Sequence, residues 1–137
     1  MAKRKNRVII DTNLWISFLL TKDFSKLDKI IADKKIMLVF SEELVEEFIE
    51  VAQRSKFRKY FAADDTEDLL LKIRYRATFI NVSSNVTACR DPKDNFLLSL
   101  AVDGQATHLI TGDKDLLVLE KFDQTKILTI SEYLTGL

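Results

Sequence analysis

Short apolar runs alternate with longer amphipathic stretches along the whole chain. A run that is apolar throughout is expected where helices cover both faces of a parallel strand. Apolar residues spaced three and four apart predict helices that bury one side. This alternation predicts an α/β domain with a mainly parallel sheet. The predicted strands are residues 8–10, 36–40, 79–82, 108–111 and 127–130.

The predicted helices fill the intervals between these strands. Ser41 is a good N-cap for a helix that continues to about Arg54, and Thr66 is expected to cap the next helix. Gly104 is expected to end a helix, because a chain leaving a helix often needs a residue with left-handed backbone angles. Ser131 is expected to cap a terminal helical turn. The other helical segments are 14–20, 24–33, 67–77, 95–102 and 116–122.

The length and composition predict one globular domain over residues 1–137. The chain has 21 basic and 21 acidic residues, so its net charge neither favours nor excludes nucleic acid. Its one cysteine, Cys89, excludes an internal disulfide and fits a reducing compartment. No apolar run approaches a membrane span, and the start lacks the apolar segment of a signal peptide. We therefore predict a cytoplasmic protein without a membrane partner. Residues 1–6 are predicted to be a flexible basic tail.

Acidic residues follow two of the predicted strands and also stand at the start of a helix. Asp11 comes directly after strand 8–10, and Asp113 follows strand 108–111. Asp91 and Asp94 lie where the helical segment near residue 95 begins. Because sites in parallel sheets lie beyond the carboxyl ends of the strands, these carboxylates are expected at one edge.

The helix that begins after Ser41 can add a further carboxylate. At about 100° per residue, Glu46 and Glu47 lie on opposite flanks of its apolar stripe. Glu43 and Glu50 lie behind the stripe and are expected to face water. A carboxylate on a flank can face a neighbouring cleft, and periodicity alone leaves both Glu46 and Glu47 open.

Four crowded carboxylates repel one another, and some take up protons unless a cation neutralises them. Oxygen ligands in that number suit Mg²⁺ or Mn²⁺, which also bind substrate phosphates. Asn13 and Thr111 are neutral neighbours suited to orienting a carboxylate, a water or a phosphate oxygen. A single acid at a strand end is more often a helix cap or a solvated loop residue, so the prediction depends on the combination.

Other chemistries are poorly served by this sequence. His108, the one histidine, begins a predicted strand and is expected to be structural. Cys89 has no histidine near it in the sequence, and a zinc site would lack its usual ligands. The three glycines are isolated from one another, which excludes a glycine-rich phosphate loop.

Basic and aromatic residues interleave in segment 54–61. One interpretation is a solvated helix end whose aromatic side chains turn inward, and it is the favoured one for the segment alone. The other is a rim that contacts phosphates and stacks on bases.

Four motifs follow one another along the chain. They are 8–13 (Val-Ile-Ile-Asp-Thr-Asn), 41–51 (Ser-Glu-Glu-Leu-Val-Glu-Glu-Phe-Ile-Glu-Val), 90–97 (Arg-Asp-Pro-Lys-Asp-Asn-Phe-Leu) and 109–117 (Leu-Ile-Thr-Gly-Asp-Lys-Asp-Leu-Leu). Taken in this order, they resemble those of the PIN-domain family, close to the toxin components of prokaryotic toxin–antitoxin pairs. The resemblance covers almost the whole chain, and the specific signal is the order of the four motifs rather than any one of them.

The resemblance implies a three-layer α/β/α sandwich with a mostly parallel five-stranded sheet. It also implies a Mg²⁺- or Mn²⁺-dependent ribonuclease that prefers single-stranded RNA. In such enzymes a cation-activated water attacks the phosphodiester, and the products carry a 3′-hydroxyl and a 5′-phosphate. Counted from Ser41, the acid of the family's helix falls on Glu47. By position, the catalytic, metal-binding residues would be Asp11, Glu47, Asp94 and Asp113, supported by Asn13, Asp91, Thr111 and Asp115.

The resemblance further implies a homodimer and inhibition by a cognate antitoxin. With RNA as the substrate, basic residues near the motifs are expected to contact its phosphates. These residues are Lys3, Arg4, Lys5, Arg54, Lys56, Arg58, Arg90 and Lys93.

The same acids leave other functions open. One is a non-catalytic PIN-like domain that binds RNA or a partner protein, and another is an RNA-processing nuclease without a toxin role. A receiver-like phosphoacceptor would need a lysine after a later strand, whereas Lys126 precedes strand 127–130. A metal-dependent phosphatase would need an Asp-x-Asp pair after the first strand, whereas Thr12 and Asn13 follow Asp11.

Overall fold

The computed structural model describes residues 6–136, in which six strands form one sheet. The strands are β1 (Asn6–Ile10), β2 (Ile36–Phe40), β3 (Ala77–Phe79), β4 (His108–Ile110), β5 (Lys121–Phe122) and β6 (Thr125–Leu128). Their order across the sheet is β3-β2-β1-β4-β6-β5, and only β5 is antiparallel to its neighbour among these strands. The predicted α/β class with a mostly parallel sheet is confirmed, and the predicted number of five strands is corrected to six.

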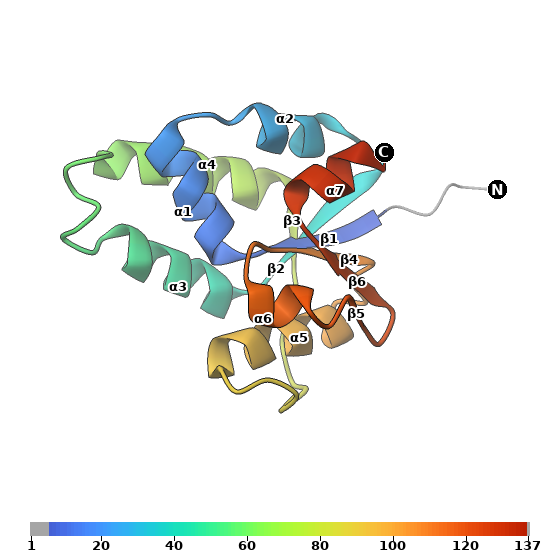
Figure 1. The fold of residues 1–137 in the computed structure, drawn as a ribbon. Coiled ribbons are helices and arrows are strands. Elements are labelled where there is room, and N and C mark those ends of the chain that lie inside the picture. Colours follow the sequence, from blue (N-terminus) through green and yellow to red (C-terminus); the bar gives the residue numbers. More distant parts are fainter. Residues whose placement is uncertain (1–5, 137) are drawn as a thin grey trace.

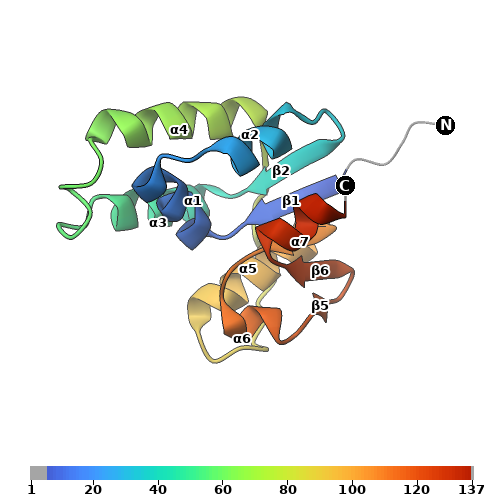
Figure 2. The same cartoon turned by 45° about the horizontal axis from the view of Figure 1, so that its top comes forward.

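Helices cover both faces of this sheet. Within residues 6–136 they are α1 (Thr12–Thr21), α2 (Ser25–Ala32), α3 (Glu42–Ala52), α4 (Ala63–Arg76), α5 (Pro92–Asp103), α6 (Lys114–Leu117) and α7 (Ile130–Thr135). The chain adds β2 and β3 on one side of β1 and then adds β4 and β6 on the other. Because crossovers between parallel strands are right-handed, the helices of the early and late crossovers belong to opposite faces. Figures 1 and 2 show α2 and α4 on one side and α5 on the other.

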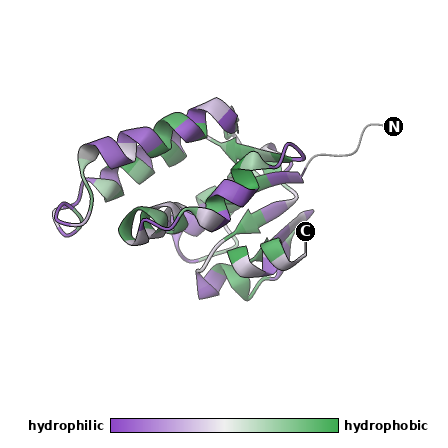
Figure 3. Cartoon of the chain, turned by 90° about the horizontal axis from the view of Figure 1, so that it is seen from above, coloured by the Kyte–Doolittle hydropathy of each residue, from purple (hydrophilic) through white to green (hydrophobic). Residues whose placement is uncertain are grey.

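The apolar runs form the core because helices shield the strands from water on both sides. Val8, Ile9 and Ile10 are at most 1% exposed. Trp15 of α1 packs on Phe40 of β2 with ring centroids 5.7 Å apart, and its indole Nε1 donates to the carbonyl of Ile10 at 3.0 Å. Figure 3 shows the strands mostly in the colour of hydrophobic residues, while hydrophilic positions mark the helices around them.

Several predicted boundaries differ from the structure. The predicted helix 116–122 is wrong beyond residue 117, where α6 ends and β5 follows. Three other differences have a clear cause. Helix α4 begins at Ala63, not near Thr66, because the carboxylate of Asp65 accepts a hydrogen bond from the Ala62 amide at 3.0 Å. Strand β3 ends at Phe79, and the predicted strand 79–82 is mostly an extended loop. Strand β6 ends at Leu128, so Thr129 rather than Ser131 caps α7 by accepting from the Glu132 amide.

Gly104 ends helix α5 as predicted, but for a different reason. Its φ is −83°, and the left-handed residue is Gln105 with φ 52°. A Cβ atom on Gly104 would lie 2.7 Å from Val39 Cγ1 and 2.9 Å from the Leu100 carbonyl oxygen. The glycine therefore allows the end of α5 to approach β2 closely.

Three polar side chains of α5, one per turn, hold the extended loop that precedes it. The amide of Asn95 accepts from the Cys89 N–H at 2.7 Å and donates to the Cys89 carbonyl at 2.8 Å. Ser99 accepts from the Val86 N–H at 3.0 Å. Asp103 accepts from the backbone amides of residues 83 and 84. We call Asn95, Ser99 and Asp103 the α5 ladder, and it fixes the route by which the chain reaches Asp91.

None of the helices within residues 6–136 is both long enough and apolar enough to span a bilayer. Of the predicted tail, residues 1–5 lie outside the described residues, and Asn6 is the first residue of β1.

Candidate metal centre

The sheet brings the first and fourth motifs together, because β1 and β4 are neighbouring parallel strands in which Ile10 pairs with Ile110. Asp11 and Thr111 are the next residues on each strand, and both are buried. The hydroxyl of Thr111 donates to Asp11 Oδ2 at 2.8 Å and accepts from the Asp113 amide at 3.0 Å. One threonine therefore positions both strand-end acids.

Three of the predicted acids also act as helix N-caps, as carboxylates at that position commonly do. Asp11 accepts from the Asn13 amide at 3.2 Å and begins α1. Asp113 accepts from the Asp115 amide at 2.9 Å and begins α6. Asp91 accepts from the backbone amide of the residue two positions on and begins α5, with Pro92 at its first position. Capping fixes one oxygen of each carboxylate and leaves the other available for other contacts.

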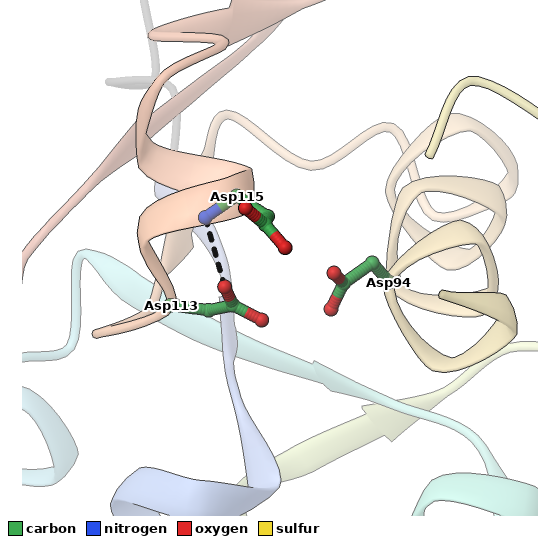
Figure 4. A group of neighbouring side chains, drawn as sticks. All are labelled: Asp94, Asp113 and Asp115. Carbon is green, nitrogen blue, oxygen red and sulfur yellow. Dashed lines mark hydrogen bonds between the residues drawn. The ribbon is translucent and has the colours of Figure 1, made fainter. Parts of the chain in front are cut away.

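Asp94, Asp113 and Asp115 form the tightest group of carboxylates, which we call the aspartate trio. Each offers one oxygen, and these oxygens all lie within 4.8 Å of one another. Figure 4 shows Asp94 projecting from α5 toward Asp113 and Asp115, which come from the start of α6. Oxygen donors from two converging helices fit a hard divalent cation such as Mg²⁺ or Mn²⁺. The trio can therefore hold a metal ion.

Asp94 has the most perturbed titration in the site. Its side chain is 4% exposed, and burial together with the charges of Asp113, Asp91 and Asp11 raises its pKa to about 7. The nearby Asp113 contributes further, because it can accept a hydrogen bond from the protonated form of Asp94. At neutral pH this carboxyl is thus divided between its two protonation states, and a bound cation would favour the ionised one.

Asp11 and Glu47 form a second group beside the trio. Burial raises the pKa of both carboxyls, and each also feels the charge of the other or of Asp113. Lys93 opposes this effect on both, and its Nζ lies 3.6 Å from Glu47 Oε1. Of the two glutamates that periodicity left open, Glu47 is half-buried at this place, whereas Glu46 is exposed.

The remaining supporting residues lie at the rim. Asn13 and Asp91 are exposed, and in the hydrogen bonds described above Asn13 supports the site through its backbone amide. Asp115, predicted to stand behind the metal ligands, lies with Asp94 and Asp113 in the trio, and its role stays a prediction. The roles of Asp11, Glu47, Asp94 and Asp113 as a catalytic quartet stay a prediction.

His108 and Cys89 have environments suited to structure. The ring of His108 meets that of Tyr133 edge-on with centroids 4.9 Å apart, its Nδ1 is 2.7 Å from Thr107 Oγ1, and burial lowers its pKa. Burial raises the pKa of the Cys89 thiol, which opposes formation of a reactive thiolate.

The predicted RNA contacts are only partly described. Lys3, Arg4 and Lys5 lie outside the described residues, and the other five are exposed. Segment 54–61 joins α3 to α4, where Phe57 and Phe61 stack on each other with centroids 6.0 Å apart. Phe61 is 7% exposed, so this ring turns inward and is not a platform for a base, whereas Tyr60 is 52% exposed.

Sequence reasoning missed two features of the site. The ion pair between Lys93 of α5 and Glu47 of α3 joins helices from different crossovers, so no local sequence pattern predicts it. The α5 ladder had a visible signal, because polar residues recur every fourth position along residues 95–103, which are otherwise apolar.

Comparison with known proteins agrees with this geometry. Residues 7–115 match the family model of the PIN domain. The chain is also 34% identical over 137 residues to the uncharacterized protein MJ1680 of Methanocaldococcus jannaschii, an alignment that covers 96% of this chain and 84% of that protein. PIN domains are generally metal-dependent nucleases, and the trio supplies the acidic cluster that such a nuclease needs. The predicted resemblance is therefore confirmed, and the chain belongs to the PIN-domain family.

Proposed function

We propose that this protein is a Mg²⁺- or Mn²⁺-dependent endoribonuclease that hydrolyses phosphodiester bonds of single-stranded RNA. The observation that carries the proposal is the buried Asp94, which faces two further carboxylates in the crevice of a PIN domain. Holding the buried Asp94 carboxylate this close to two others is costly without a cation, which supports a metal at this site.

The roles of the side chains follow from their contacts. The trio would hold the cation, which supplies positive charge to the phosphate and makes water a stronger acid. Asp94 must release its proton for this, and its pKa of about 7 lets it do so at neutral pH. Thr111 keeps Asp11 oriented toward the same crevice. The exposed Arg54, Lys56, Arg58, Arg90 and Lys93 can contact phosphates of the RNA.

Cleavage of a labelled single-stranded RNA tests the proposal. The purified protein is incubated with Mn²⁺, with Mg²⁺ or with a chelator, beside Asp94→Asn and the control Asp68→Asn, which changes an exposed acid on α4. We expect cleavage with either cation, no cleavage with the chelator, and a loss of at least about 100-fold in Asp94→Asn, because removing a ligand should exceed the effect of removing a group that only supports one. The products should carry 5′-phosphates.

RNA that binds without being cut at any metal concentration would favour the non-catalytic alternative. Equal cleavage by the Asp94→Asn and Asp68→Asn proteins would contradict the assigned site.

We further propose that the nuclease is the toxin of a toxin–antitoxin pair, acting in the cytoplasm, where the one cysteine would stay reduced. As a toxin it would form a homodimer and be inhibited by a cognate antitoxin. Induced expression should then arrest growth of the host cell, and expression of Asp94→Asn should not. Growth that continues with an active nuclease would favour an RNA-processing role instead.

A further inference from the structure

Lys93 places a cation at one side of the acidic crevice. It lies in the first turn of α5, one residue before Asp94. Its Nζ is 3.6 Å from Glu47 Oε1 on α3. The Glu47 side chain is 26% exposed and that of Lys93 is 57% exposed, so the pair is partly shielded from solvent.

The acids of the crevice therefore divide into two groups with different partners. Asp94, Asp113 and Asp115 face one another across α5 and α6, and no ammonium or guanidinium group within residues 6–136 forms an ion pair with them. Glu47 and the nearby Asp11 share the charge of Lys93, and Asp11 in addition accepts hydrogen bonds from Thr111 and Asn13.

We propose that the Lys93 ammonium group takes the place of a second metal ion, so that the chain binds one divalent cation, at the aspartate trio. The proposal rests on the proposed function only in taking the trio as the metal site. A second divalent cation between Asp11 and Glu47 would meet the positive charge of Lys93 and would have to displace it from Glu47. Glu47 already pairs with a cation, and Asp11 already accepts two hydrogen bonds.

The arrangement would still place two cationic groups beside a bound phosphate, the divalent metal and the lysine ammonium. Two-metal sites stabilise the attacking and leaving oxygens from opposite sides. Because the Lys93 side chain is more than half exposed, its ammonium group can exchange the Glu47 carboxylate for a phosphate oxygen without a change in the backbone of α5.

Counting bound Mn²⁺ tests this inference without RNA or activity. The full chain is titrated with Mn²⁺ alone up to millimolar concentration, and binding is followed by calorimetry and by electron paramagnetic resonance of the free ion. Wild type and the charge-retaining Lys93→Arg should bind one ion per chain. Lys93→Met should bind two, and adding Glu47→Gln to it should return the count to one. Lys114→Met is the matched control, because Lys114 is an exposed lysine between Asp113 and Asp115, and it should still bind one ion.

Two ions in wild type would overturn the proposal, since Lys93 would then yield its place to a metal. One ion in both wild type and Lys93→Met would also overturn it. Circular dichroism confirms that each variant is folded. No binding in any protein would contradict the metal-dependent function itself, which separates failure of that function from failure of the Lys93 assignment.

Discussion

Asp11 and Asp94 are two nearly buried carboxylates in one crevice, with very different surroundings. Asp11 is 7% exposed and accepts hydrogen bonds from the Thr111 hydroxyl and the Asn13 amide. Asp94 is 4% exposed, faces Asp113, and has no hydrogen-bond donor among the described residues. Burial raises the pKa of both, yet only that of Asp94 reaches about 7.

The difference shows that burial alone does not decide how far the pKa of a carboxyl rises. The hydrogen bonds of Asp11 lower its pKa against the effect of burial, so that this carboxylate is stabilised by the fold itself. Asp94 is opposed by its neighbours, so a bound cation would stabilise its ionised form. A cation is therefore expected at Asp94, where such compensation is missing.

The largest effect should come from Asp94→Asn in the metal-free protein. The pKa of Asp94 is raised from 3.8 to about 7 by folding, so the native state holds this proton more tightly than the unfolded chain does. The associated stability is present at low pH and is lost as pH rises through 7. An asparagine avoids this loss. With chelator present, we expect the variant to exceed wild type by about 4 kcal/mol in unfolding free energy at pH 8.5 and to match it near pH 4.

Urea unfolding from pH 4 to 8.5 measures this difference. Asp68→Asn, which changes an exposed acid, should follow the wild-type curve throughout. If the unfolding free energy of Asp94→Asn differed from that of wild type by the same amount at every pH, repulsion at Asp94 would already be relieved within the chain.

Thr111→Val should have the next largest effect and the opposite sign. The change keeps the shape of the side chain but removes the donor to Asp11 and the acceptor of the Asp113 amide. Leaving these buried groups without partners should cost about 2 kcal/mol of unfolding free energy. Mn²⁺ affinity should also fall about tenfold, as when a group that orients a ligand is removed. Thr111→Ser restores the hydroxyl and should recover both; a valine variant as stable as wild type would refute the role of this bond.

Asp115→Asn should have the smallest effect, confined to metal binding. Asp115 is exposed, so its replacement should leave stability nearly unchanged. Because it contributes one oxygen to the trio, the Mn²⁺ dissociation constant should rise about tenfold in calorimetric titrations. Asp91→Asn is the matched comparison, an exposed acid at the start of α5 outside the trio, and should change the constant less than threefold. Equal effects would show that Asp115 acts only through its charge.

Much of the fold could be predicted because parallel strands covered on both faces are apolar throughout. Strand β2 has the predicted bounds, Ile36–Phe40. The predicted bounds of β3 were wrong because Ile80 and Val82, although apolar, belong to the loop after the strand. They pack against the core from this loop. Strand β5 was not predicted because it has only two residues. It pairs with β6 across a short turn in which Asp123 has φ 54°.

The edge at which the acids gather could also be predicted, because Asp11 and Asp113 follow strands that pair directly. Which carboxylate oxygens lie close together depends on how α5 packs near α6. This tertiary packing cannot be read from a local sequence pattern. The same limit explains Asp115, which sequence position alone left behind the ligands, and the pairing of Lys93 with Glu47.

The α5 ladder has a consequence for how this chain can vary. The three ladder side chains hold the preceding loop mainly through backbone groups of residues 83, 84, 86 and 89, which any amino acid except proline can supply. The path of the loop is therefore determined mainly by side chains of the helix that follows it. Exposed loop positions can therefore change without altering the path to the candidate metal centre, whereas Val86 and Cys89 also pack against the core.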